Sequence, residues 1–166
     1  MNLRRLLFTA LLTLAAVTAR ATSNYEYGAD EYVTIYHGIS PDGKLAITTH
    51  GEGDLGTDHF HVYLFDAIAG KKIGPLEEIK DVLDTEAGAY SARWKKDSSE
   101  VTIVYRVDRH APLKAMSYRF GKGRAFPLTR QPVDLRDSDP LVRLHSEAMD
   151  GNRMPERVFG TPKPRR

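Results

Sequence analysis

The sequence contains no cysteine, so no disulfide holds this chain together in any cellular compartment. It has almost no excess of charge of one sign, with a formal net charge of +2 at pH 7. Beyond its first 21 residues it also has no run of about 20 apolar residues, the length that a membrane-spanning helix needs. Without disulfides or a membrane anchor, the fold must be stabilised by a packed core.

The first 21 residues have the layout of a secretory signal peptide. Arg4 and Arg5 precede an apolar run from Leu6 to Val17, and the small-residue pattern of Ala19 and Ala21 follows. The apolar run is shorter than a membrane-spanning helix requires, which favours cleavage after Ala21 over retention as an anchor. No cysteine follows that position, so a lipid anchor is not expected. We therefore expect an exported protein, either periplasmic or secreted.

Removal of residues 1–21 takes away three arginines and no acids, so the formal charge falls from +2 to −1. The electrostatic argument for a nucleic-acid partner disappears with those residues. The 145 residues that remain of 166 fit one domain of ordinary size, which we place at 22–152. The stretch 153–166 ends in GTPKPRR and is expected to be a flexible basic tail.

Between residues 32 and 126 the dominant hydrophobic period is two, the pattern of half-buried strands. Strand-like segments EYVTIYHG, KLAITTHG and HFHVYLFD are separated by the turn SPDG and by an acidic loop. The same scheme returns in AYSARW, EVTIVYRV and LKAMSYRF. The sequence thus predicts two antiparallel meanders, at about 32–74 and 89–128.

The segments ISPDGKLAIT and VYLFDAIAGKKI resemble one blade of a β-propeller of the WD-repeat or TolB-like kind, and ARWKKDSSEVTIVYR with MSYRFGKGRAF resembles a second blade. The resemblance implies a binding surface, since such blades mostly serve interactions. Two blades are too few for a closed propeller. We therefore expect a mainly β fold in which two blade-like meanders pack as a sandwich or half-open barrel, unless another subunit completes them.

Two segments have helical signals, so one or two short helices are expected. Residues 75–86 begin with proline and two acids, as a first helical turn prefers, although an outer strand is the alternative. Residues 139–150 have a stronger pattern, with Ser138 or Asp139 as the cap, Pro140 at the start and Gly151 at the end.

The stretch HGEGDLGTDHFH contains His50, His59 and His61. Alternation places all three on one face of a hairpin. If His50 lies opposite His59, three imidazoles come within reach of one zinc ion, with water or an acid such as Glu52, Asp54 or Asp58 as the fourth ligand. The alternative is a solvated face beside a flexible loop. The residues favour the loop, because the pattern permits a tetrahedral site without requiring it.

Tyrosines gather near the mature N-terminus, and Tyr25, Tyr27 and Tyr36 are candidates for a protein interface. The plainer interpretation is that they cover the edge of the core. No nucleophile elbow, phosphate loop or metalloprotease motif occurs, so nothing assigns a catalytic residue. We expect an exported, non-enzymatic binding or accessory domain that meets a protein partner or self-associates. The alternative is a zinc-binding protein or metal-dependent hydrolase that uses the histidine cluster.

Overall fold

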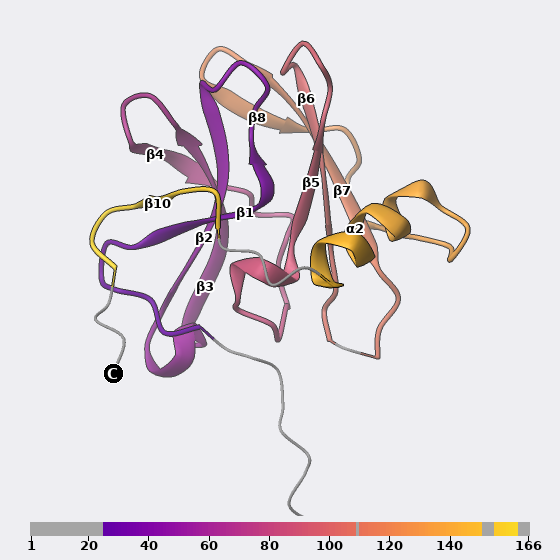
Figure 1. Ribbon diagram of the computed structural model, residues 1–166, viewed down its shortest axis with the longest axis horizontal. Coiled ribbons are helices and arrows are strands. Elements are labelled where there is room, and N and C mark those ends of the chain that lie inside the picture. Colours follow the sequence, from indigo (N-terminus) through magenta and orange to yellow (C-terminus); the bar gives the residue numbers. More distant parts are fainter. Residues whose placement is uncertain (1–24, 109, 151–154, 163–166) are drawn as a thin grey trace, which may run out of the picture.

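The computed structural model describes residues 25–108, 110–150 and 155–162, so the expected signal peptide lies outside it (Figure 1). The first half of the fold consists of β1 (Tyr32–Ile39), β2 (Leu45–Glu52), β3 (His59–Asp66) and β4 (Lys71–Pro75). The second half consists of β5 (Ser91–Trp94), β6 (Glu100–Tyr105), β7 (Lys114–Gly121) and β8 (Arg124–Pro127). The shorter elements are η1 (Asp54–Gly56), η2 (Ala87–Ala89), β9 (Val133–Asp134), α2 (Pro140–Asp150) and β10 (Val158–Phe159).

The strands form one sheet in the order β4-β3-β2-β1-β5-β6-β7-β8, with β9 on β7 and β10 on β1. Each meander is antiparallel, and the two are joined where β1 and β5 run parallel, with Tyr36 opposite Ser91. The sheet curls into a barrel that is nearly closed, with β4 and β8 as its two ends (Figure 1). This confirms the prediction of a mainly β fold built from two antiparallel meanders.

The interior of the barrel is the main core, because alternate side chains of every strand point into it. Alternation along β3 puts Phe60, Val62 and Leu64 on one face, and these three side chains pack inside the barrel. The fully buried members of this core come from both meanders and from the segment between them: Ile35, Ile47, Val62, Leu64, Leu76, Ile79, Tyr90, Ala92, Val101, Ile103, Tyr105, Met116 and Tyr118.

The outer face of the first meander is apolar and is covered by the C-terminal segment. Phe159 of β10 lies opposite Tyr32 in the sheet and stacks on Phe65 with ring centroids 4.9 Å apart. The backbone of Arg157 exchanges hydrogen bonds with Thr34, and its guanidinium donates to the carbonyl of Ala67. Residues 158–159 therefore form a strand within the stretch expected to be a flexible tail, and residues 153–154 and 163–166 of that stretch lie outside the described residues.

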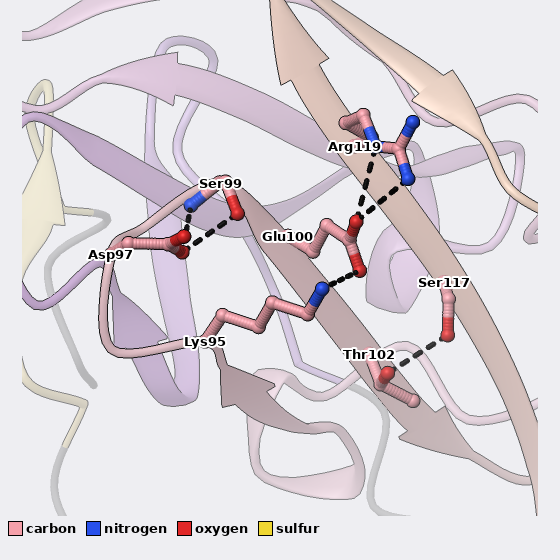
Figure 2. Close-up of polar contacts among 7 residues, drawn as sticks. All are labelled: Lys95, Asp97, Ser99, Glu100, Thr102, Ser117 and Arg119. Atoms are coloured by element: carbon pink, nitrogen blue, oxygen red, sulfur yellow. Dashed lines mark hydrogen bonds and ion pairs between the residues drawn. The ribbon is translucent and has the colours of Figure 1, made fainter.

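The outer face of the second meander is polar and carries a cluster of paired charges (Figure 2). Glu100 on β6 lies opposite Arg119 on β7 and accepts two hydrogen bonds of 3.0 Å from it. The ammonium of Lys95 lies 2.7 Å from the same carboxylate. Next along the ladder, the hydroxyls of Thr102 and Ser117 lie 2.8 Å apart. Glu100, Lys95 and Arg119 therefore form an ion-paired cluster on this solvated face.

The helix expected over residues 75–86 is wrong, because the structure has no α-helix there. The amide of Leu76 donates to the carbonyl of Val62 and so prolongs the contact between β4 and β3. Asp81 has a φ of 59°, a left-handed conformation that a right-handed helix does not allow. Leu76 and Ile79 are apolar because they enter the barrel core separately.

The helix expected over residues 139–150 is confirmed as α2. Asp139 caps it, since its carboxylate accepts a hydrogen bond of 2.9 Å from the amide of Leu141. Ala148 faces inward, and so does His145, which is only 2% exposed. Among the described residues, α2 and the two 3-10 turns are all too short or too polar to cross a membrane as a helix.

Candidate functional site

The three candidate zinc ligands lie on one face of the β2–β3 hairpin, as alternation predicts. Their register differs from the expected one: His50 lies opposite His61, and His59 lies opposite Glu52. The expected pairing of His50 with His59 is therefore wrong by two residues. A shift of two residues keeps every side chain on its own face, so the hydrophobic pattern could not distinguish the two registers.

His50 serves the packing of the N-terminal segment. It is 2% exposed, and its Nδ1 donates a hydrogen bond of 2.6 Å to the carbonyl of Glu31. Its ring also stacks on Tyr32, with centroids 4.5 Å apart. One of its two ring nitrogens is thus already engaged in the fold.

His59 and His61 lie side by side on β3, with ring centroids 4.6 Å apart. His59 is exposed, whereas the Nδ1 atom of His61 is buried and makes no hydrogen bond. Within the described residues, no group of three or more histidines and acids is arranged to hold a metal ion. The zinc site stays a prediction from the sequence.

The candidate interface tyrosines have different surroundings. Tyr27 is 8% exposed, and its hydroxyl donates a hydrogen bond of 2.5 Å to the carbonyl of Thr85. Burial raises its pKa well above the ordinary value for tyrosine. Tyr25 is half-buried and donates to Glu31 at 2.7 Å, and Tyr36 is half-buried at the β1–β5 junction. Tyr27 therefore belongs to the core, and only Tyr25 and Tyr36 present surface to a partner.

A cleft of about 440 Å³ lies between the segments that follow the two end strands of the sheet. One wall follows β4, and the other combines the start of β7 with the segment that follows β8. The floor comes from the end of β6. The lining residues are Glu77, Glu78, Lys80, Asp81, Tyr105, Val107, Lys114, Arg130, Gln131 and Pro132.

The floor of the cleft carries an unused hydrogen-bonding group. Tyr105 is 1% exposed and stacks on Tyr90, with ring centroids 5.9 Å apart. Its hydroxyl makes no hydrogen bond with a described residue, and it remains accessible to solvent. Burial, with the nearby charge of Asp81, raises its pKa to about 12. At physiological pH it is a neutral phenol whose O–H can donate a hydrogen bond to a ligand.

Opposite charges line the two walls without neutralising each other. Glu77 and Asp81 on one wall, and Arg130 on the other, make no ion pair or hydrogen bond with a described residue. Lys114 differs, because its ammonium lies 2.7 Å from the carboxylate of Asp134. Lys80 lies on the same wall as the acids and also has no ion-pair partner among the described residues. The cleft thus has one wall with an excess of unpaired acids and another with an unpaired guanidinium, unlike the paired charges of Figure 2.

The acidic wall is tied to the opposite meander by Glu78. Its carboxylate accepts a hydrogen bond of 3.0 Å from the hydroxyl of Tyr118 on β7. Burial and this carboxylate raise the pKa of Tyr118 well above the ordinary value. The bond fixes the segment after β4 against a strand near the other end of the sheet, so the wall is held in place.

The cleft was not predicted from the sequence. Glu77 and Glu78 matched the first turn of a helix, and Lys114 and Arg130 belong to no motif. The available signal was the run Glu77–Asp81, which has four charged residues in five and lies just after β4. In an extended segment such a run presents charges on both sides, as it does along this wall.

A buried serine–histidine pair joins α2 to the barrel. The hydroxyl of Ser91 and Nδ1 of His145 lie 2.9 Å apart in a hydrogen bond. Ser91 is fully buried and His145 is 2% exposed. A serine nucleophile must reach its substrate, and this hydroxyl is covered by the helix, so the pair acts as an anchor for α2.

Comparison of the chain with protein-family models, with curated proteins and with solved structures gives no match. The resemblance to propeller blades therefore stays a prediction from the turn and strand motifs.

Proposed function

We propose that the chain is an exported, periplasmic or secreted, binding or accessory domain without catalytic activity, and that its ligand occupies the cleft above Tyr105. The observation that carries the proposal is the hydroxyl of Tyr105. A buried tyrosine usually finds a hydrogen-bond partner, and this one has none among the described residues. A ligand in the cleft supplies that partner.

The size and chemistry of the cleft support this assignment. Its volume of about 440 Å³ is within the range of small-molecule sites, about 300–1,000 Å³. Val107 and Pro132 provide apolar surface, while a few convergent polar groups surround them. Such a combination allows a small ligand to be both desolvated and oriented.

Export is tested by expressing residues 1–166 in a bacterial host and fractionating the cells. We expect a mature protein outside the cytoplasm whose first residue is Thr22. Replacing Ala19 by tyrosine is expected to leave the precursor uncleaved, because the peptidase pocket accepts only small side chains there. A parent chain that stays in the cytoplasm at full length would contradict the proposal.

Binding at the cleft is tested by NMR titration of the ¹⁵N-labelled mature protein with amino acids, short peptides, monosaccharides and nucleotides. We expect one class to shift the amide resonances of residues 77–81 and 130–132 in a saturable manner. Tyr105→Phe, which removes only the hydroxyl, is expected to weaken that binding by about tenfold, the value of one hydrogen bond.

Arg119→Gln is the matched control for this titration, because it alters a charge on the polar face of Figure 2 and leaves the cleft unchanged. It should bind as the parent does. Shifts that map to another surface, or equal affinity of the parent and Tyr105→Phe, would rule out the cleft as the binding site.

A further inference from the structure

The unpaired charges of the cleft restrict the chemical class of the ligand more than the volume of the cleft does. On the polar face, Lys95 and Arg119 neutralise Glu100 directly. In the cleft, Glu77 and Asp81 outnumber Lys80 on one wall, and Arg130 lies on the other. None of these four side chains has an ion-pair partner among the described residues. A bound molecule that neutralises both walls must itself carry a positive and a negative group.

We propose that the ligand of the cleft is a short peptide with free amino and carboxyl termini, bound as a zwitterion between the acidic wall and Arg130. This inference rests on the proposed function above. The guanidinium of Arg130 matches a terminal carboxylate, which it can bind with two parallel hydrogen bonds. The carboxylates of Glu77 and Asp81 match the terminal ammonium.

The floor of the cleft supplies the rest of the recognition. The hydroxyl of Tyr105 can donate a hydrogen bond, and a peptide carbonyl can accept it. Val107 and Pro132 offer apolar contacts for peptide side chains. Tyr105 is buried, whereas the unpaired acids of one wall and Arg130 on the other are exposed. The site therefore combines one hydrogen-bond donor in a fixed position with charged side chains that can adjust to the ligand.

Other small-ligand classes fit this pattern less well. A nucleotide phosphate would meet Arg130 but would also be repelled by Glu77 and Asp81. A neutral sugar would use the hydroxyl of Tyr105 and leave both charged walls unpaired. Lys114 is already neutralised by Asp134, and the cleft's other two cations, Lys80 and Arg130, share it with the unpaired carboxylates of Glu77 and Asp81.

The test is a calorimetric titration of the mature protein with dialanine, its N-acetyl derivative and its C-terminal amide. We expect dialanine to bind with one-to-one stoichiometry, and each blocked derivative to bind at least about tenfold more weakly, because each lacks one charge-assisted contact. Added salt should weaken the binding of dialanine, since the charged side chains are exposed.

Two variants test which wall of the cleft binds each terminus of the peptide. Arg130→Gln should bind dialanine and its amide equally. Asp81→Asn should reduce the loss of affinity that N-acetylation of dialanine causes. Asparagine is suitable at this position because it tolerates the left-handed backbone conformation of Asp81. Arg119→Gln should retain the full preference of the parent for free termini.

Two results would overturn the inference. Blocked derivatives that bind as tightly as dialanine would show that the termini are not recognised, and the absence of saturable heat with any peptide would exclude the class. The NMR titration then separates this inference from the proposed function. If another compound class binds at residues 77–81 and 130–132, only the peptide assignment fails, and if no class does, both fail.

Discussion

Replacing Tyr90 with alanine is expected to lower the free energy of unfolding by about 4 kcal/mol. Tyr90 is fully buried in the barrel, directly before β5. Its ring stacks between Phe60 and Tyr105, each with a centroid distance of 5.9 Å. Truncating a large buried aromatic side chain removes its contacts and leaves a cavity, which in other proteins costs about 3–5 kcal/mol.

Urea denaturation of the parent and the variant measures this loss, with the conservative variant Tyr90→Phe as its control. Phenylalanine keeps the ring and removes only the hydrogen bond of 2.7 Å that the hydroxyl donates to the carbonyl of Asp84. That variant should lose only about 1 kcal/mol. If alanine costs no more than phenylalanine, the ring of Tyr90 is not an essential part of the barrel core.

The two variants also separate the stability of the barrel from the shape of the cleft. Tyr90 supports the ring of Tyr105, which forms the floor of the cleft. Tyr90→Phe keeps this support, so it should retain ligand binding, whereas Tyr90→Ala leaves Tyr105 without one of its neighbours. A floor residue held by a stacked neighbour is more rigid than one that faces solvent on both sides.

The strands could be predicted from the sequence because the period of two is a local signal. Phe60, Val62 and Leu64 enter the barrel, while His59 and His61 stay on the other face. Turn chemistry also contributed: Gly43 in the SPDG turn has a φ of 70°, a conformation that glycine adopts at little cost. Both signals depend only on neighbours in the chain, so no tertiary information was needed.

The register and the segment after β4 could not be predicted, because both depend on contacts between distant residues. His50 opposite His59 and His50 opposite His61 satisfy the same hydrophobic pattern. Leu76 and Ile79 have helical spacing, but the open end of the barrel provides a separate place in the core for each of them. Tertiary burial therefore overrides a local helical preference.

The cleft could not be predicted for a similar reason. Its walls come from residues 77–81, Lys114 and residues 130–132, which approach one another only because the curled sheet brings its two ends together. The role of Tyr105 is also a tertiary property, since alternation assigns its ring to the core but does not show that its hydroxyl lacks a partner. The remaining signal in the sequence was the charged run Glu77–Asp81.

The stability of the protein is expected to fall by about 3 kcal/mol between pH 7 and pH 4 through His145 alone. Burial beneath α2, with the repulsion of nearby Arg106, lowers the pKa of His145 from 6.5 to about 4. Between these values the unfolded chain binds a proton that the folded chain does not, so acid favours unfolding. The contribution is fully present above pH 6.5 and disappears as the pH falls towards 4.

His145→Gln is the control for this pH dependence, because glutamine can still hydrogen-bond to Ser91 and does not titrate. From pH 7 to pH 4 the unfolding free energy of the parent should therefore fall by about 3 kcal/mol relative to that of the variant. An NMR titration of the parent gives a second test that does not require the variant to fold. The His145 ring should keep its neutral chemical shifts down to about pH 5, and a midpoint near 6.5 would mean that α2 leaves this side chain in solvent. In that case Ser91 and His145 would not form the buried anchor that holds the helix on the barrel.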